Sequence, residues 1–237
     1  MSVSIDHYKK MLAQPWGKIQ YELTFYHLRH ITNKKVLDFG AGFGLTSQHL
    51  SKHNQVTAVE PNCDLLFADS NQTFTKIAGS LEVLETFPDK SFDIILCHNV
   101  LEYIPKEEHA DYLAAFERLL TDDGELSLIK HNLTGKVMQA VVFENNTQKA
   151  NALLAGDTDF DSPSFSQGNS YTLEELVANT RLKLQSYQGM RTFYSLQPNN
   201  VKMEKDWLER MLAIEIQVAD LKPYKDIAFL QYVTLTK

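Results

Sequence analysis

Three glycines and one acidic residue are crowded into the segment VLDFGAGFG, residues 36–44. Gly40, Gly42 and Gly44 occupy alternate positions after a short apolar run, and Asp38 precedes the first of them. Glycine loses more conformational entropy on folding than any other residue. Such a cluster therefore indicates either a loose turn or a backbone that must approach a ligand too closely for a side chain to fit.

The spacing of this loop differs from that of the glycine-rich loop that binds dinucleotides. In G-x-G-x-x-G the third glycine comes one residue later, and the following helix is spaced to cradle a pyrophosphate. Here Asp38 places a carboxylate where a phosphate would be repelled. A nucleoside with a cationic head suits these residues better. S-adenosylmethionine, which carries an ammonium and a sulfonium group, is such a ligand.

A second carboxylate supports this interpretation. Glu60 ends the next apolar run, about 20 residues after the loop, where a carboxylate can accept both hydroxyls of a ribose. Pro61 follows it and ends the run. A solvated charge at a strand end is the alternative interpretation for Glu60.

Short apolar runs alternate with helical segments along the first half of the chain. We expect strands at 34–40, 55–61, 74–80, 91–100 and 125–132, helices at 45–53, 63–70 and 107–120, and a turn at 121–124. Nearly continuous apolar strands separated by helices are typical of a parallel sheet covered on both faces. Ligands bind such sheets beyond the carboxyl ends of the strands, which is where the glycine loop and Glu60 lie.

The remaining segments are expected to flank this core. The pattern predicts an N-terminal helical lid at 1–33 with a break near Pro15 and Gly17, an insertion or substrate lid at 133–170 with a helix at 136–156, and a C-terminal part at 171–237. That last part is expected to hold a helix at 171–180, strands at 182–191 and 227–237, and a long amphipathic helix at 201–221.

The ordered segments VLDFGAGFG, VTAVEPN, SFDIILCHNVLEYI and LLTDDGELSLI resemble the motifs of class I S-adenosylmethionine-dependent methyltransferases. The resemblance implies a Rossmann-like α/β fold with a seven-stranded, mostly parallel sheet, helices on both faces and an antiparallel last strand. It implies one methyltransferase domain over 1–237, with a cofactor-binding core at 34–132. The implied cofactor is S-adenosyl-L-methionine, and the product is S-adenosyl-L-homocysteine.

The resemblance also implies which residues bind the cofactor. In that family an acidic side chain in the loop after the third strand accepts from the adenine amino group. That role falls to Glu82, with the backbone of Ser80 and Leu81 beside it; a solvated loop carboxylate is the alternative. The expected cofactor-binding set is Asp38, Gly40, Ala41, Gly42, Gly44, Glu60, Pro61, Ser80, Leu81, Glu82 and His98.

Longer segments resemble the bacterial tRNA 5-carboxymethoxyuridine methyltransferases, which esterify a carboxylate on a modified wobble uridine. These segments are HNVLEYI, LSLIKHNLTGKVMQAVVFENN and GMRTFY, followed by a closing helix and strand. The chain departs from that family at Gln20, where we would align a basic residue, and at AGDTDFDSP, which replaces a basic loop. Recognition of tRNA would require Lys130, Lys136, Lys149 and Arg191 to cluster.

Three side chains are candidates for contact with the methyl acceptor. His98 follows the fourth strand and His131 ends the fifth, where an imidazole can act as a base or hydrogen-bond the acceptor. Arg191 can hold a carboxylate or phosphate bidentately. The structural alternatives are a backbone contact at His98, a strand-end turn at His131 and a surface arginine at Arg191. A carboxylate or free amine acceptor would need no base, whereas a phenol or hydroxyl would.

Composition limits the class of partner. The chain has 237 residues, 43% of them hydrophobic, and a net charge of −7, which excludes a histone-like nucleic-acid binder. No run approaches the roughly 18 apolar residues of a membrane helix. Cys63 and Cys97 match no metal-binding spacing, so we expect both to be reduced and buried.

These observations leave the acceptor open. We expect a cytoplasmic protein with no metal and no membrane partner, and the sequence leaves a homodimer open. Its acceptor is either a tRNA or a small metabolite with a carboxylate, amine or phenol. A protein that binds S-adenosylmethionine without transferring its methyl group is the third alternative.

Overall fold

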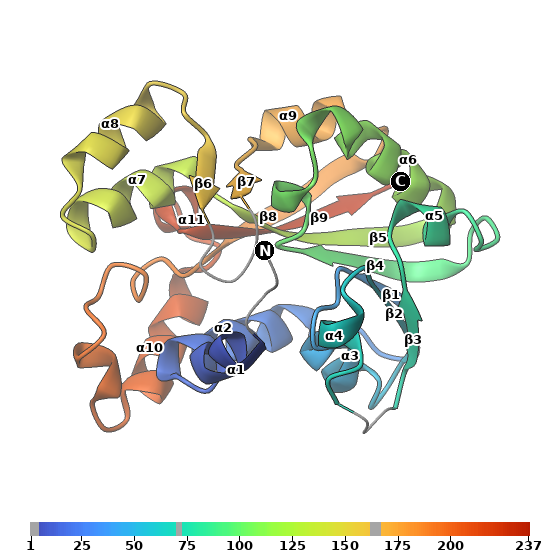
Figure 1. Ribbon diagram of the computed structural model, residues 1–237, viewed down its shortest axis with the longest axis horizontal. Helices are drawn as coiled ribbons and strands as arrows, with labels where there is room; N and C mark the ends of the chain where they lie inside the picture. The colour runs from blue at the N-terminus through green and yellow to red at the C-terminus, as the bar shows by residue number, and fades with distance from the viewer. Residues whose placement is uncertain (1–4, 70–72, 162–166) are drawn as a thin grey trace. The chain divides into compact units, whose positions relative to one another are not determined.

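A seven-stranded sheet is the framework of the computed structural model, which describes residues 5–69, 73–161 and 167–237 (Figure 1). The strand order is β3-β2-β1-β4-β5-β9-β8. The strands are β1 (Lys35–Phe39), β2 (Gln55–Glu60), β3 (Thr75–Ala78), β4 (Phe92–His98), β5 (Leu120–His131), β8 (Lys183–Met190) and β9 (Leu230–Thr236). The predicted N-terminal lid, the predicted helix at 63–70 and the predicted insertion each include residues outside the described ranges.

Hydrogen bonds fix the directions of the strands. β1 pairs in parallel with β2 and β4, β2 with β3, and β4 with β5. β9 runs the other way along β5. The backbone N–H of Asn132, just after β5, donates to the carbonyl of Phe229, just before β9, at 3.0 Å. At the other end, Lys237 Nζ donates to the carbonyl of Leu120. The predicted mostly parallel sheet with an antiparallel last strand is therefore confirmed.

The chain divides into two compact units, each described here by itself. Unit 2 comprises His27–Ile129, Leu173–Ser186 and Val233–Lys237, and it contains β1 to β4 complete. Its helices α3 (Leu45–Leu50) and α4 (Cys63–Leu66) lie on one face of those strands, and α6 (His109–Leu119) lies on the other (Figure 1). The short α5 (Leu81–Leu84), α9 (Leu173–Ala178) and two 3-10 turns, η1 (Leu101–Tyr103) and η2 (Lys106–Glu108), complete it.

Aromatic packing joins β1 of unit 2 to its covering helix. The Phe39 ring, at the end of β1, lies edge-on to Phe116 with centroids 5.3 Å apart and tilts against Tyr112 at 5.6 Å. All three side chains are buried. Because β1 is apolar on both faces, it can sit only between two layers of helices, and this packing fixes the strand end that leads into the glycine loop.

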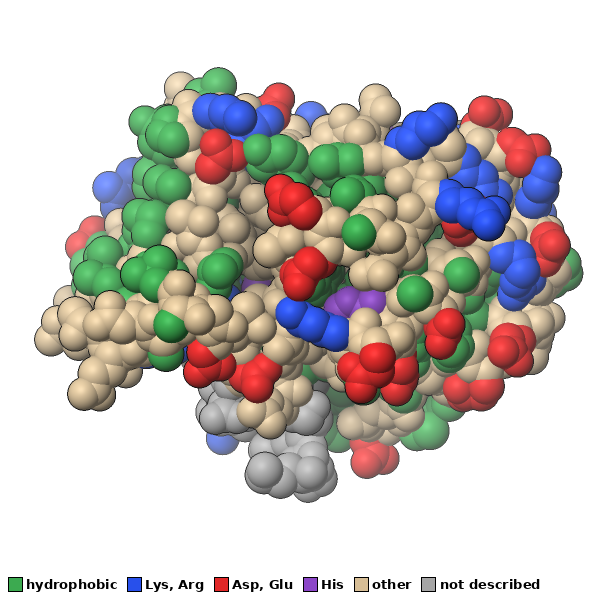
Figure 2. Space-filling model, turned by 90° about the horizontal axis from the view of Figure 1, so that it is seen from above, with side chains coloured by type: hydrophobic (Ala, Val, Ile, Leu, Met, Phe, Trp, Pro, Cys, Tyr) green, Lys and Arg blue, Asp and Glu red, His purple; other side chains and the backbone are tan. Residues whose placement is uncertain are grey.

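Unit 1 comprises Met1–Tyr26, Lys130–Thr172 and Tyr187–Tyr232. Its elements are α1 (Ile5–Leu12), most of α2 (Pro15–Leu28), α7 (Leu133–Val142), α8 (Thr147–Leu154), the antiparallel pair β6 (Asp159–Asp161) and β7 (Gln167–Asn169), η3 (Val201–Met203), α10 (Trp207–Val218) and α11 (Tyr224–Ile227). Hydrophobic side chains gather over α7 and α8 (Figure 2, left), where Val142 and Leu154 are exposed. Strands β5, β8 and β9 have residues in both units.

Two predicted helices are interrupted by residues in the left-handed region. The predicted helix at 136–156 is two helices, because Asn145 has φ 50° and Asn146 caps α8 by accepting from the backbone N–H of Lys149 at 2.9 Å. The predicted helix at 201–221 is wrong at its start, because Asp206 has φ 60° and α10 begins only at Trp207. Asparagine and aspartate tolerate this conformation better than most residues, but apolar periodicity does not reveal it.

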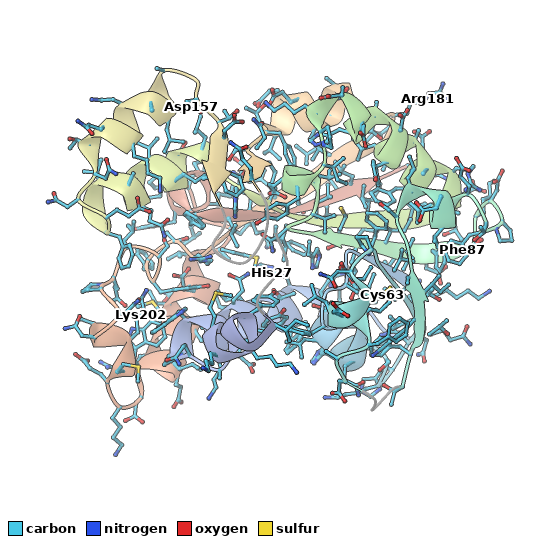
Figure 3. The ribbon with its side chains drawn as sticks, in the orientation of Figure 1. His27, Cys63, Phe87, Asp157, Arg181 and Lys202 are labelled. Atoms are coloured by element: carbon cyan, nitrogen blue, oxygen red, sulfur yellow. The ribbon has the colours of Figure 1, made fainter. Side chains whose placement is uncertain are left out.

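Three smaller expectations need correction. The predicted turn at 121–124 lies within β5 as an irregularity in register: Leu120 pairs with Phe92, and the next pair joins Glu125 to Ile94. The N-terminal break lies at 13–14, so Pro15 begins α2, where a missing N–H costs nothing, and Gly17 lies inside that helix. Cys97 is buried as expected, but Cys63 is exposed on α4 (Figure 3).

Candidate active site

The glycine loop after β1 is held against the end of β2 by its own backbone. The N–H groups of Gly40 and Ala41 both donate to the carbonyl of Val59, at 2.8 and 3.2 Å. The N–H of Gly42 donates to Glu60 Oε2 at 2.9 Å, and the N–H of Asn62 donates to Glu60 Oε1 at 2.9 Å. The Glu60 carboxylate is thus oriented by two backbone donors, and each oxygen keeps a second lone pair for a ribose hydroxyl.

Two glycines of the loop have different tasks. Gly40 has φ 74°, and a Cβ there would lie 2.2 Å from Val100 Cγ2, so the chain needs glycine to close the loop on its neighbour. Gly42 has φ 55°, and a Cβ there would meet no heavy atom within 4 Å. The space over Gly42 is therefore open, next to the oriented Glu60 carboxylate. A nucleoside bound there would touch bare backbone, which fits the predicted ligand.

Asp38 gives this end of the sheet a buried negative group. It is 4% exposed, and its Oδ2 accepts from Ser47 Oγ at 2.6 Å. Burial raises the pKa of Asp38 to about 6, the Ser47 hydrogen bond opposes that shift, and the charge of Glu60 adds to it. Burial also raises the pKa of Glu60, although its two backbone donors oppose the change. A bound cation would relieve both carboxylates.

The loop after β3 folds back on itself. Glu82 Oε1 accepts from the backbone N–H of Ser80 at 2.8 Å, and Ser80 Oγ lies 2.9 Å from Tyr112 OH on α6. Leu81 begins α5, and the Glu82 side chain is exposed. The other oxygen of Glu82 has no backbone hydrogen bond among the described residues, and it can accept from an adenine amino group.

An open cavity of about 450 Å³ lies at the end of β2, lined by Pro61, Asn62, Cys63 and Asp64. Pro61 is exposed on this rim, while Gly44 ends the glycine loop and starts α3 with φ 71°. Together the residues after β1, β2 and β3 in unit 2 offer two buried carboxylates, an exposed one and a bare backbone. This donor set suits S-adenosylmethionine, whose ammonium, ribose and adenine groups all donate hydrogen bonds.

The His98 side chain is placed for structure more than for proton transfer. Its Nε2 lies 2.9 Å from Ser127 Oγ of the neighbouring strand. Burial lowers the pKa of His98 to about 3, and the nearby His27, at the end of α2 (Figure 3), adds to the effect. The imidazole is therefore neutral at physiological pH and a weak base. A contact between the His98 backbone and the cofactor, at the end of β4, stays a prediction.

His131 in unit 1 is enclosed by rings and cations. Its imidazole lies between the rings of Phe160, at 4.8 Å, and Phe229, at 5.4 Å. Burial lowers the pKa of His131 well below its usual value, and the charges of Lys136, Arg191 and Lys130 lower it further. Like His98, it stays neutral.

Arg191 stands in the left-handed region, with φ 61°. Its guanidinium lies over the Phe229 ring at 4.5 Å and near the Tyr194 ring at 5.2 Å. Its Nε is buried and has no hydrogen-bond partner among the described residues. Arg191 is thus half-buried on aromatic rings, and the simple surface arginine that served as its alternative does not describe it.

Sequence reasoning missed two neighbours of Arg191. Lys202, on η3 (Figure 3), is 5% exposed, and its Nζ donates to Asn199 Oδ1 at 3.1 Å. Burial and the charge of Arg191 lower the pKa of Lys202 to about 8. Gln20 Oε1 accepts from Tyr194 OH at 3.0 Å, while Gln20 Nε2 is buried without a partner among the described residues. No motif around Lys202 or Gln20 in the sequence indicates that either residue could bind a ligand.

The four basic residues that tRNA recognition would bring together cluster only in part. Lys130, Lys136 and Arg191 all act on His131, so these three do gather in unit 1. Lys149 is exposed and ion-paired with Glu144 at 2.7 Å.

Within the described ranges, no three His, Cys, Asp or Glu side chains are grouped as a metal site. Nor does any described helix have the length and apolar character that a membrane span requires.

Comparison with known proteins agrees with this reading of the fold. Residues 37–128, which lie within unit 2, match the family model of a methyltransferase domain. No curated protein matches the sequence. The fold is similar to that of a protein from Pyrococcus horikoshii, with a TM-score of 0.59 and 13% identity over 98% of this chain and 92% of that one.

Two further solved structures are similar at the level of the fold. One is an S-adenosylmethionine-dependent methyltransferase from Mesorhizobium loti, with a TM-score of 0.59 and 14% identity over 94% of this chain and all (100%) of that one. The other is the 1,6-didemethyltoxoflavin-N1-methyltransferase of Burkholderia thailandensis, with bound S-adenosylhomocysteine. Its TM-score is 0.52, with 16% identity over 91% of this chain and 75% of that one.

Replacing Gly42 by alanine tests the open space over the loop. The Gly42→Ala protein is expected to bind S-adenosylmethionine about tenfold more weakly or worse, because the methyl group enters the space beside Glu60; isothermal titration calorimetry measures this. Gly156→Ala is the matched control, since Gly156 also has a positive φ and nothing within 4 Å of a Cβ. Both should lose about 1 kcal/mol of stability. Equal cofactor affinities in the two variants would remove the loop from the site.

Asp38 predicts a pH dependence of cofactor affinity. With a pKa of about 6, Asp38 is mostly ionised at pH 7 and mostly protonated at pH 5. Loss of its charge weakens attraction for a cation, so the Kd for S-adenosylmethionine should rise about tenfold between pH 7 and pH 5. Asp38→Asn should remove most of this dependence, whereas Asp111→Asn, exposed on α6, should keep it. A flat profile in the unmodified protein would contradict the assignment.

Proposed function

Because the chain is an S-adenosylmethionine-dependent methyltransferase, we propose that its acceptor is an acid whose carboxylate is methylated and is recognised by unit 1. The observation that carries this proposal is a pair of buried donors in unit 1, Arg191 Nε and Gln20 Nε2, which have no hydrogen-bond partner among the described residues. The buried charged side chains in the described part of unit 1 are Lys130, Lys136, Lys202 and Glu215. Three of these four are lysines, and the charge of Arg191 lowers the pKa of both His131 and Lys202 in the same unit. Lys130 Nζ donates to the His131 carbonyl and Lys136 Nζ to Ser170 Oγ. Lys202 is buried near Arg191, and an acid bound to these two would offset their charge.

Arg191, Lys202 and Gln20 supply the donors that would hold the carboxylate, and we call these three residues the clamp. Tyr194 links two of them, since its hydroxyl bonds to Gln20 and its ring lies under the Arg191 guanidinium. The unpartnered Nε of Arg191 and Nε2 of Gln20 are both buried donors. A buried donor without a partner costs free energy, and a carboxylate can satisfy both while Lys202 adds its charge. Aromatic rings beneath the guanidinium hold it in place.

The protonation states of the histidines favour an acceptor that needs no base. Burial holds the pKa of His98 at about 3 and the pKa of His131 well below its usual value. Imidazoles of such low pKa take up a proton poorly at neutral pH, so a phenol or alcohol would lack an effective base. A carboxylate arrives already ionised.

The cofactor, when bound, supplies a methyl group activated by its sulfonium charge. In the proposed transfer, a carboxylate oxygen would form the new O–CH₃ bond as the S–CH₃ bond breaks, and the electron pair of that bond would go to sulfur. No proton is lost or gained. The part of Arg191 and Lys202 is to hold one oxygen of the acid and leave the other free to react. The neutral ester produced is no longer attracted to them.

Two acids fit this chemistry. A tRNA bearing a carboxylate on a modified uridine is supported by the resemblance of HNVLEYI and GMRTFY to the enzymes that esterify it. A cavity of about 630 Å³ in unit 2, lined in part by Lys90, Arg118 and Arg181, offers such a polyanion a basic surface. Against this, Lys90 is paired with Asp122 and Arg118 with Asp89, and acidic and basic side chains mix over α6 (Figure 2, right).

A free metabolite acid is the second candidate. The net charge of −7 and the burial of Lys130, Lys136 and Lys202 suit a compact carboxylate better than an extended phosphate chain. The Burkholderia thailandensis enzyme, which has the same fold, is a small-molecule methyltransferase by name and shows that the fold admits such acceptors.

Transfer of labelled methyl from S-adenosylmethionine to fractions of a bacterial lysate tests the proposal. We expect base-labile label, as an ester gives, in either the tRNA fraction or the small-acid fraction. Label in tRNA identifies the wobble-uridine class, and label in the acid fraction identifies a metabolite. Base-stable label would contradict an ester product. No label in any fraction, with cofactor binding intact, would favour a binding protein instead.

Arg191→Lys tests the clamp. Lysine keeps the charge but loses the planar, bidentate fork, so the KM for the labelled fraction should rise about tenfold or more, while the Kd for S-adenosylmethionine stays within about twofold. Arg210→Lys, exposed on α10, is the matched control. An unchanged KM in Arg191→Lys would mean that Arg191 does not hold the acceptor.

A further inference from the structure

The loop that carries Arg191 is tied to a single buried carboxylate. Glu215, on α10, is 1% exposed. Its Oε2 accepts from the backbone N–H of Thr192 at 2.8 Å, and its Oε1 accepts from those of Phe193 at 2.8 Å and Tyr194 at 3.0 Å. Three successive amides therefore converge on one anion. Such a run of backbone N–H groups is a recognised anion-binding arrangement, and here the chain supplies the anion itself.

This arrangement determines the backbone at Arg191. The left-handed φ of 61° at Arg191 turns the chain so that the next three N–H groups face α10. The Arg191 carbonyl is held by Ser195 Oγ at 2.7 Å, which closes the turn. A non-glycine residue rarely adopts this conformation unless its surroundings impose it. The Glu215 carboxylate is the strongest such constraint on this loop, because charge-assisted hydrogen bonds are about twice as strong as neutral ones.

The same bonds leave the Arg191 side chain available. Both oxygens of Glu215 accept hydrogen bonds from backbone amides, and Arg191 Nε has no hydrogen-bond partner among the described residues. The guanidinium lies instead over Phe229 and Tyr194. A direct ion pair between the two side chains would have consumed the donors that an acid needs.

We infer that Glu215 is a positioning residue for acid recognition: by filling the anion site of residues 192–194 it holds Arg191 in the conformation that presents its guanidinium to the acceptor. The inference rests on the proposed function. Glu215 itself does not touch the acceptor, since it is buried and its oxygens are occupied. A glutamate that merely ties α10 to a loop would affect stability and nothing else.

Glu215→Gln separates these roles. Glutamine keeps the size of the side chain but loses the charge and turns an N–H₂ group toward amides that need acceptors. Glu209→Gln, exposed on the same helix, is the matched control. We expect Glu215→Gln to raise the KM for the fraction that takes up labelled methyl about tenfold. The Kd for S-adenosylmethionine should stay within about twofold, and Glu209→Gln should match the unmodified protein in both.

Hydrogen exchange gives a readout that does not depend on the acceptor. The amides of Thr192, Phe193 and Tyr194, followed by mass spectrometry of their peptide, should exchange about tenfold faster in Glu215→Gln than in Glu209→Gln. Glu215→Ala empties the anion site and should raise the KM. Sodium acetate should bring that KM part of the way back down, whereas sodium chloride of equal ionic strength should not. Recovery by a free carboxylate is not expected from a helix that has simply lost packing.

The outcomes distinguish this inference from the proposed function. If Arg191→Lys raises the acceptor KM but Glu215→Gln does not, the positioning role is overturned and the clamp stands. If Arg191→Lys leaves the KM unchanged, the clamp fails and the role of Glu215 in acid recognition fails with it, and exchange then tests only whether Glu215 holds residues 192–194. Unchanged exchange in Glu215→Gln overturns the inference in either case. If Glu215→Gln does not fold, acetate recovery of Glu215→Ala decides the question, and its absence overturns the inference.

Discussion

The parallel pairing of β1 with β2 is the constraint on which the proposed cofactor site depends. The register sets Phe39 beside Val59, so the glycine loop leaves β1 where Glu60 ends β2. The Val59 carbonyl can then take both loop amides, and Gly42 can reach the Glu60 carboxylate. A slip of one residue would turn Glu60 to the other face of the sheet and separate these groups. The aromatic packing of Phe39 against α6 keeps that strand end in place.

Buried charge of opposite sign marks the two units. Unit 2 buries Asp38, Glu60 and Glu102, and unit 1 buries three lysines against one glutamate. Each charge is costly to remove from water, so partners within the protein or a bound ligand must offset that cost. A cationic cofactor suits the first set and an acid acceptor suits the second. The net charge of −7 reveals neither, because it sums over a solvated surface.

Several differences between prediction and structure share one cause. The helix break at Asn145, the late start of α10 after Asp206 and the turn at Arg191 all depend on a positive φ at a residue other than glycine. The sequence pattern shows which residues tolerate that conformation but not which adopt it, because the neighbours that impose it can be distant in the chain. At Arg191 the neighbour is Glu215, on another element.

The sequence by itself determined the sheet, the cofactor and most of the strand-end residues proposed to bind it. Glycines, carboxylates and apolar runs within 34–132 carry that information locally, since strand ends in a parallel sheet must meet. The group of residues proposed to bind an acid was decided only by tertiary structure. Gln20, Arg191, Lys202 and Glu215 come from four separate segments, and each alone is an ordinary polar residue. Their chemistry arises from burial and from the charges that folding places beside them, which no local spacing records.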